Sequence, residues 1–152
     1  MGKILTWDEL KETVDRLKAG GKRVVFTNGC FDIIHSGHIR YLKEAKALGD
    51  VLVVGLNSDM SILIIKPDRP IIPQDQRAEI LSSLEMVDYV TLFDEETPYE
   101  LIKLLHPDIL VKGGDWKKED IVGHDIVKET VSLPYIKGIS TTEIIERIKR
   151  LS

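Results

Sequence analysis

Five short apolar runs, separated by stretches with helical spacing, constrain the fold of this chain more than any other feature of its sequence. The runs are rich in aliphatic residues, as expected of strands buried on both faces. Strands that alternate with helices are typical of a parallel sheet with helices on both faces. We therefore predict a Rossmann-like α/β fold with a doubly wound, five-stranded parallel sheet. The predicted strands cover residues 24–26, 51–56, 87–93, 109–111 and 131–136, and Pro134 in the last run favours an edge position.

Three pairs of residues with the spacing of a capping box mark predicted helix starts. In such a box, a serine or threonine and a glutamate three residues later each accept a hydrogen bond from the other's backbone amide. Pro98 is expected at the first position of the second of these helices. The pairs are Thr6 with Glu9, Thr97 with Glu100, and Ser140 with Glu143.

The length, charge and cysteine content of the chain limit its class. With 152 residues it is long enough to bury a real core, and we assign residues 1–152 to a single domain. The formal net charge of −4 argues against a general binder of nucleic acid or membrane surfaces. One cysteine provides no disulfide framework, and no apolar run approaches the length of a membrane span. We therefore expect a cytoplasmic protein.

The segment after the first predicted strand has the features of a phosphate site. Asn28-Gly29 ends the strand, and His35 and His38 flank the start of the next predicted helix. Free backbone amides and the positive end of the helix dipole face the same spot, and Gly37 lets a ligand approach the backbone. Ligands of open α/β sheets bind at the carboxyl ends of strands, so this position favours a phosphate ligand.

Other interpretations of the histidine pair are a chance surface feature and half of a zinc site. Zinc is disfavoured, because Cys30 is the only cysteine and the two remaining histidines, His106 and His124, lie in other segments. We predict no metal bound by the protein's own side chains. The chain also lacks a P-loop and a G-x-G-x-x-G fingerprint, which disfavours a dinucleotide dehydrogenase.

Polar and basic groups follow other predicted strands. Residues 57–59 either cap the next helix or line the same site. Residues 66–70 form a basic loop bounded by prolines, which is either a mobile flap or a solvated turn. Glycines 113–114 permit close approach of a ligand to the backbone, and residues 140–142 open the last helix. Two helix N-termini with hydroxyls and imidazoles suit a polyphosphate, which indicates a nucleotide.

The residues that carry these features resemble a known family. The run Gly29-Cys30-Phe31-Asp32-Ile33-Ile34-His35-Ser36-Gly37-His38 contains the signature of the H-x-G-H nucleotidyltransferases, the cytidylyltransferase-like superfamily. Within it, residues 6–151 most resemble the adenylyltransferases of heptose 1-phosphate in lipopolysaccharide core synthesis. Two departures are the apolar residues 62–65, where arginines are expected, and Pro67-Asp68 in place of a glycine-rich turn. The narrower likeness rests on residues 27–32, 54–59, 69–71, 93–98, 107–115 and 140–145.

The resemblance implies a reaction and a set of partners. The adenylyl group of ATP would pass to D-glycero-β-D-manno-heptose 1-phosphate, a sugar 1-phosphate, giving ADP-heptose and pyrophosphate. Mg²⁺ would accompany ATP, and neither nucleic acid nor a membrane would take part. We expect a homodimer, with residues 62–65 as one candidate contact, and a functional pairing with a heptose kinase, because many members are fused behind a sugar kinase.

The resemblance also implies roles for the residues of the phosphate site. His35 and His38 would hold the α- and β-phosphates and stabilise the transition state, and Lys66 would reach over the site as a mobile cation. Ser140 and Thr141 would hold the β,γ end of the nucleotide.

The remaining implied contacts surround the nucleotide. Cys30 and Phe31 would pack on it through their backbones, and Asp32 would orient a histidine or a magnesium-bound water. Arg77 would bind phosphate. Lys112 and Asp115 would border the base or ribose. The other residues implied in binding are Asn28, Gly29, Gly37, Asn57, Asp59, Gly114 and Thr142.

Three alternative functions share these features. A glycerol-3-phosphate cytidylyltransferase has the same signature, but there we expect a threonine in place of Cys30 and an arginine before the last helix that residues 135–138 lack. An FAD synthetase of the archaeal type is a second alternative. A nucleotide-binding sensor without turnover is a third, and the intact set of His35, His38 and Lys66 argues against it.

Overall fold

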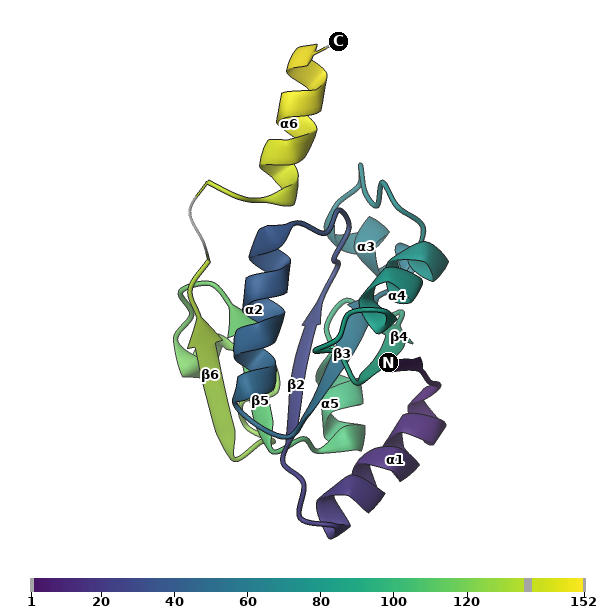
Figure 1. The fold of residues 1–152 in the computed structure, drawn as a ribbon, viewed down its shortest axis with the longest axis vertical. Helices are drawn as coiled ribbons and strands as arrows, with labels where there is room; N and C mark the ends of the chain where they lie inside the picture. Colours follow the sequence, from purple (N-terminus) through teal and green to yellow (C-terminus); the bar gives the residue numbers. More distant parts are fainter. Residues whose placement is uncertain (1, 136–137, 152) are drawn as a thin grey trace.

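The fold is a parallel sheet with helices on both faces, as predicted (Figure 1). The computed structural model describes residues 2–135 and 138–151. Within these residues the sheet has six strands in the order β1-β4-β3-β2-β5-β6, and every pairing is parallel. The strands are β1 (Lys3–Ile4), β2 (Val24–Gly29), β3 (Val51–Asn57), β4 (Tyr89–Phe93), β5 (Ile109–Gly113) and β6 (Glu129–Leu133).

The predicted number of five strands is therefore wrong by one. The additional strand, β1, has two residues and pairs only with β4 at the edge of the sheet. Both of its residues are exposed, so no buried apolar run marks it in the sequence. The edge position of the last strand is confirmed, since β6 pairs only with β5. Its predicted end, Ile136, lies outside the described residues.

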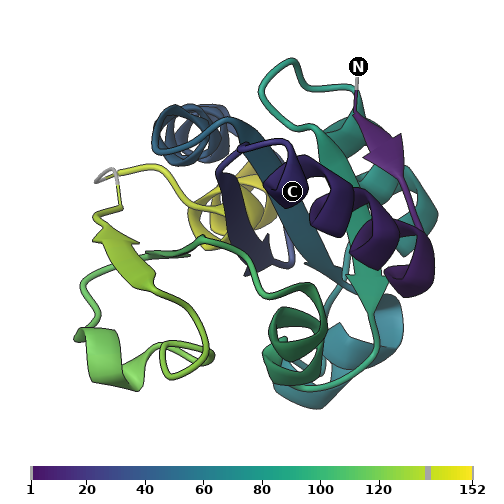
Figure 2. The same ribbon diagram turned by 90° about the horizontal axis from the view of Figure 1, so that it is seen from below.

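Helices cover the two faces of the sheet and bury a separate apolar cluster on each. One cluster joins the sheet to α2 and α4 through Leu42, Ala45, Ala78 and Leu81. The other joins it to α1 and α5 through Leu10, Val14, Leu101, Ile102 and Leu105. Figure 2 shows α2 and α5 on opposite sides of β2. The helices are α1 (Trp7–Ala19), α2 (Ser36–Ala47), α3 (Asp59–Ile65), α4 (Gln74–Ser82), α5 (Tyr99–Leu105) and α6 (Thr141–Leu151), with a 3₁₀ turn η1 (Lys118–Asp120).

Two of the three predicted capping pairs form hydrogen bonds. Thr6 and Glu9 make a complete capping box at α1, with bonds of 3.0 and 3.2 Å. The Ser140 hydroxyl accepts the Glu143 amide at 3.0 Å. The box at Thr97 is wrong: α5 begins one residue later, with Pro98 at the cap, and the Thr97 hydroxyl accepts the Tyr99 amide at 3.5 Å instead of the Glu100 amide.

The strand order reverses between β2 and β5, and this point determines where a ligand site forms. Strands β3 and β4 extend from one side of β2, whereas β5 and β6 extend from the other. Chains leaving β2 and β5 therefore diverge to opposite faces and leave a crevice at their carboxyl ends. The helix α6 projects from this end of the molecule, and no residue of it is buried (Figure 1). None of the described helices is long and apolar enough to cross a membrane.

Candidate active site

A cavity of about 840 Å³ opens at the carboxyl ends of β2, β3 and β5. Its volume lies in the range of small-molecule sites, roughly 300–1,000 Å³. Most of the predicted site residues line it, which brings together the segments after three strands and the start of α6. They are Asn28, Gly29, Cys30, Phe31, Asp32, His35, Gly37, His38, Asn57, Lys66, Lys112, Ser140, Thr141 and Thr142.

The two histidines cap α2 through their δ nitrogens. Nδ1 of His35 accepts the Gly37 amide at 3.1 Å, and Nδ1 of His38 accepts the His35 amide at 3.2 Å. The two rings lie with centroids 3.9 Å apart. An Nδ1 that accepts a hydrogen bond carries no proton, so each neutral ring has its N–H at Nε2. Gly37 is needed here because a Cβ would lie 2.8 Å from the His35 ring.

Burial keeps this pair of imidazoles neutral. Desolvation, and to a smaller extent repulsion from the neighbouring His35 ring, lower the pKa of His38 to about 4. Desolvation also lowers the pKa of His35. At neutral pH the site therefore offers two Nε2–H donors and the free amides of the α2 N-terminus, a set that suits phosphate oxygens without a fixed positive charge.

The lowered pKa of His38 predicts a loss of stability in acid. Unfolded histidine takes up a proton near its ordinary pKa of 6.5, whereas His38 in the folded protein does so only near 4. Its contribution to stability is therefore complete above pH 6.5 and is lost as the pH falls towards 4. We expect urea unfolding of the ligand-free protein to show a larger drop from pH 7.5 to 5.5 than unfolding of His38→Asn, whose amide oxygen can replace Nδ1 as acceptor. Equal drops in the two proteins would contradict the assignment.

Asp32 lines the cavity, and its carboxylate also fastens a loop, a contact that was not predicted. Its carboxylate accepts the Ile71 amide at 2.9 and 3.0 Å and the Ile72 amide at 2.8 Å. The side chain is almost fully buried. The loop that carries Lys66 and Arg69 is thereby attached to the segment that follows β2. Sequence alone could not predict this, because the partners are backbone groups about forty residues away.

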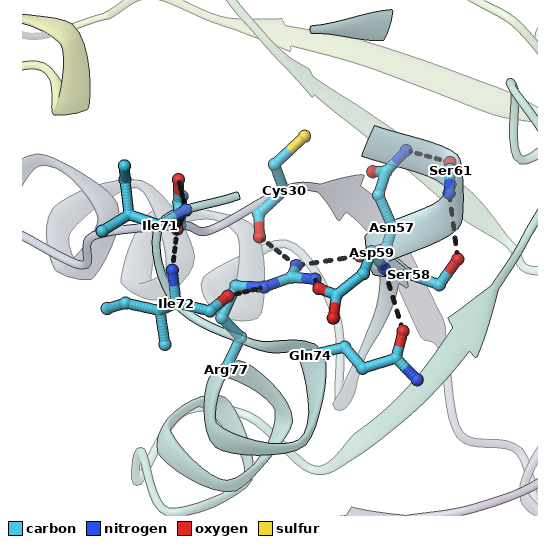
Figure 3. A network of polar contacts seen from close by, with 10 residues as sticks. Cys30, Asn57, Ser58, Asp59, Ser61, Ile71, Ile72, Gln74 and Arg77 are labelled. Atoms are coloured by element: carbon cyan, nitrogen blue, oxygen red, sulfur yellow. Dashed lines mark hydrogen bonds and ion pairs between the residues drawn. The ribbon is translucent and has the colours of Figure 1, made fainter. Parts of the chain in front are cut away.

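Arg77 is a buried structural link and not an exposed phosphate ligand, which corrects the prediction (Figure 3). Its guanidinium donates to the carbonyls of Cys30, Asn57 and Ile72 at 2.7–2.8 Å. It also pairs with the Asp59 carboxylate at 2.8 Å. Neither Arg77 nor Asp59 lines the cavity. The pair instead joins the ends of β2 and β3 to α4, which holds the lining residues Cys30 and Asn57 in place.

Both interpretations of residues 57–59 are realised, by different residues. Ser58 caps α3, since its hydroxyl accepts the Ser61 amide at 3.1 Å. Asn57 lines the cavity, and its side-chain amide donates to the Ser61 hydroxyl at 3.0 Å. The polar triplet therefore supports the site and the following helix together.

The end of β5 forms a wall of the cavity with an aromatic surface. Lys112 is half-buried, with Nζ 5.5 Å from the centre of the Trp116 ring, and burial lowers its pKa. Gly114 has a φ of +110°, and a Cβ there would lie 3.0 Å from Trp116 Nε1. Gly114 thus supports the wall without lining the cavity, and the exposed Asp115 does not line it either. Two predicted contacts therefore lie off the cavity, whereas Gly113 lines it.

Several lining residues were absent from the sequence prediction. Tyr41 was not singled out in the sequence, but it lines the cavity, and its hydroxyl lies 2.5 Å from the Thr27 hydroxyl. Trp116 gave no signal beyond its place two residues after the glycines 113–114. Arg69 belongs to the basic loop, but Lys66 was the cation chosen there. Glu44, Glu96 and Asp120 also contribute carboxylates to the lining.

The carboxylates of the site suit a Mg²⁺ ion that is bound together with a nucleotide. No group of three or more histidine, cysteine or acidic side chains converges on a metal position within residues 2–135 and 138–151. Asp32 is already engaged with two amides. Mg²⁺ typically keeps several waters and binds substrate phosphates with one or two carboxylates. The lining acids can supply that number, so ATP would provide most of the ligands.

Comparisons with known proteins agree with this geometry. Residues 26–147 match the family model described as cytidylyltransferase-like. The chain is 56% identical over 147 residues to the bifunctional protein HldE of a Nitratiruptor species, covering 96% of this chain and 32% of that protein. It is 54% identical over 147 residues to the bifunctional protein HldE of Aliarcobacter butzleri, covering 96% and 31%. The chain thus spans about a third of the length of these curated relatives.

Solved structures give the same result for the fold. A lipopolysaccharide core biosynthesis protein from Thermoplasma volcanium superposes with a TM-score of 0.65 at 32% identity, over 77% of this chain and 100% of that chain. A pantoate-beta-alanine ligase from Francisella tularensis also superposes with a TM-score of 0.65, at 17% identity, over 98% and 77% of the two chains. The second likeness concerns the fold alone.

Proposed function

This chain belongs to the cytidylyltransferase-like family, and we propose that it transfers the adenylyl group of ATP to D-glycero-β-D-manno-heptose 1-phosphate. The family predicted from the sequence, nucleotidyltransferases with the H-x-G-H signature, is confirmed. The observation that carries the proposal is the pair of Nε2–H donors of His35 and His38, which line one cavity together with the start of α6. The acceptor is proposed from the heptose-type stretches of the sequence and from the lipopolysaccharide core protein among the relatives.

The proposed reaction is a single displacement at phosphorus. An oxygen of the acceptor phosphate forms a bond to the α-phosphorus of ATP, the bond from that phosphorus to the bridging oxygen breaks, and pyrophosphate leaves. The catalytic requirement is to position the two substrates and to stabilise charge on phosphate oxygens. No covalent intermediate with the enzyme is required. Mg²⁺, when bound with ATP, neutralises part of the phosphate charge.

The residues of the chain have separate roles in this proposal. His35 and His38 donate through Nε2 to oxygens of the α- and β-phosphates. Ser140, Thr141 and the first amides of α6 bind the β,γ end, which suits the positive end of the helix dipole. Cys30 and Phe31 contact the nucleotide through their backbones, with the Asn28–Gly29 strand end beside them.

Two lysines extend the site on either side of the phosphates. Lys66 is exposed at the end of α3 and lines the cavity, so it can approach a bound phosphate. Lys112 lies at the end of β5 against Trp116, where a flat base and its ribose can be accommodated. We assign the base or ribose to this wall, since it is the aromatic part of the lining.

The experiment that tests the function is pyrophosphate release with Mg²⁺, comparing ATP and CTP with β-heptose 1-phosphate and glycerol 3-phosphate. Release only with ATP and the heptose phosphate is expected. CTP with glycerol 3-phosphate would keep the reaction class and replace the proposed acceptor with that of a glycerol-3-phosphate cytidylyltransferase. FMN is included with ATP as a third acceptor, and release in that pairing would favour an FAD synthetase. ATP binding without release in every pairing would support a nucleotide sensor.

The proposed setting is the cytoplasm, where ATP is available, in partnership with a heptose kinase that supplies the sugar 1-phosphate. We also propose a homodimer. Of the predicted contact residues 62–65, Ile62 is fully buried and cannot take part. The other three, Leu63, Ile64 and Ile65, together with Met60 of the same helix α3, are each between 44% and 64% exposed. A contact between two copies would remove them from water. Sedimentation at micromolar concentration checks this, and a mass of one chain would contradict it.

A further inference from the structure

Arg69, which lies beside Asp32, differs from Arg77 in how its guanidinium is bonded. Arg69 lies in the Lys66–Pro70 loop and lines the cavity. Its side chain is 16% exposed, so most of it is shielded from water although it carries a full charge. Its charge partner is Asp32, at 4.0 Å from Nη1. Arg69 is therefore a cation held at the cavity with only a distant counter-charge.

The hydrogen-bonding capacity of Arg69 is largely unused. A guanidinium has five N–H donors. Among the described residues, Arg69 makes one side-chain hydrogen bond, from Nη2 to Thr142 Oγ1 at 3.4 Å. Arg77 by contrast makes four bonds of 2.7–2.8 Å. The Asp32 carboxylate is already occupied by two amides at 2.8–3.0 Å, which explains why it approaches Arg69 no more closely.

The one hydrogen bond of Arg69 places it at an anion-binding position. Thr142 belongs to the first turn of α6, an eleven-residue helix whose N-terminal amides lack partners within the helix. The Thr141 hydroxyl donates to the Ile33 carbonyl at 3.1 Å, in the loop between β2 and α2, so this helix start is fixed beside the histidine segment. A guanidinium next to a helix N-terminus gives two kinds of donor to one anion, and arginine often binds phosphate through two parallel bonds.

We propose that Arg69 binds the pyrophosphate portion of ATP and stabilises it as the leaving group. This rests on the proposed nucleotidyl transfer. The guanidinium exchanges the weak bond to Thr142 for oxygens of the β- and γ-phosphates, which lie against the start of α6. As the bond between the α-phosphorus and the bridging oxygen breaks, negative charge builds on the departing pyrophosphate, and a cation at that end lowers the barrier. Asp32 holds the following residues, Ile71 and Ile72, so the loop keeps Arg69 close to the site.

The test uses inorganic pyrophosphate as the probe and three variants. Arg69→Met removes all donors, Arg69→Lys keeps the charge, and Arg69→Gln keeps a donor for Thr142 without the charge. We expect Arg69→Met and Arg69→Gln to bind pyrophosphate at least tenfold more weakly in calorimetry and to lower kcat by about 10²-fold. Arg69→Lys should recover part of both losses, and KM for the sugar phosphate should be unchanged.

The control and the contrary outcomes separate this proposal from the function on which it rests. Arg23→Met removes a solvent-exposed arginine paired with Glu129 and should leave pyrophosphate binding as in the wild type. Wild-type affinity in Arg69→Met, or full recovery in Arg69→Gln, would overturn the proposal and leave Arg69 as a link to α6. If the wild type binds pyrophosphate through Arg69 but turns over no acceptor, the contact stands and the proposed function fails.

Discussion

Replacement of His38 by asparagine is expected to lower kcat by about 10²–10³ while the protein stays folded, which is the effect of removing one preorganised donor from a charged transition state. The asparagine oxygen occupies nearly the position of Nδ1, so it can still accept the His35 amide that His38 accepts at 3.2 Å. What the variant loses is Nε2–H, the group that we assign to a phosphate oxygen. Pyrophosphate release at saturating ATP and acceptor measures the loss.

Two further variants make the result specific. His38→Gln loses the δ acceptor but places an amide N–H near the former Nε2, so it should retain more activity than His38→Asn. His106→Asn is the matched control on the surface: His106 ends α5 with a φ of +51°, which asparagine tolerates well. It should behave as the wild type. Activity of His38→Asn within threefold of the wild type would contradict a donor role for His38.

The sequence predicted those parts of the fold that depend on local pattern. Buried runs such as residues 51–56 and 109–111 are strands because consecutive apolar residues need cover on both faces of a sheet. The strand β1 was missed because two exposed residues, Lys3 and Ile4, carry no such pattern and form a strand only by pairing with β4. The helix α5 begins after Pro98, one residue later than expected, a difference that the spacing of Thr97 and Glu100 cannot reveal.

For the site, the sequence was informative about residues that belong to a local motif. His35, Gly37 and His38 are neighbours along the chain, and their geometry follows from one helix start. The contacts of charged residues whose partners are distant backbone groups could not be predicted. Asp32 and Arg77 have the side chains of ligands, but the groups that satisfy them come from segments between five and forty-seven residues away. A buried link and an exposed ligand look the same in a sequence without its fold.

The second large effect is expected at Arg77. Arg77→Met should lower the free energy of unfolding by about 3–5 kcal/mol, because it leaves buried acceptors without a donor. The three carbonyls of Cys30, Asn57 and Ile72 account for most of this, since the fourth partner, Asp59, is 40% exposed and its ion pair is screened by water. Urea unfolding at pH 7.5 measures the change. Arg23→Met, at a side chain 57% exposed, should change it by about 0.5 kcal/mol or less.

The same variant discriminates between the two roles that Arg77 could have. A phosphate ligand can be removed at little cost to stability, and its loss would appear as weaker ATP binding in a protein as stable as the wild type. A link between strand ends has the opposite signature: stability falls first, and ATP binding falls because Cys30 and Asn57 no longer hold their places. Arg77→Lys sharpens the comparison, since one ammonium keeps the charge but cannot reach four acceptors in different directions. It should therefore resemble Arg77→Met in stability, whereas rescue of stability and ATP binding by lysine would return Arg77 to the role of a phosphate ligand.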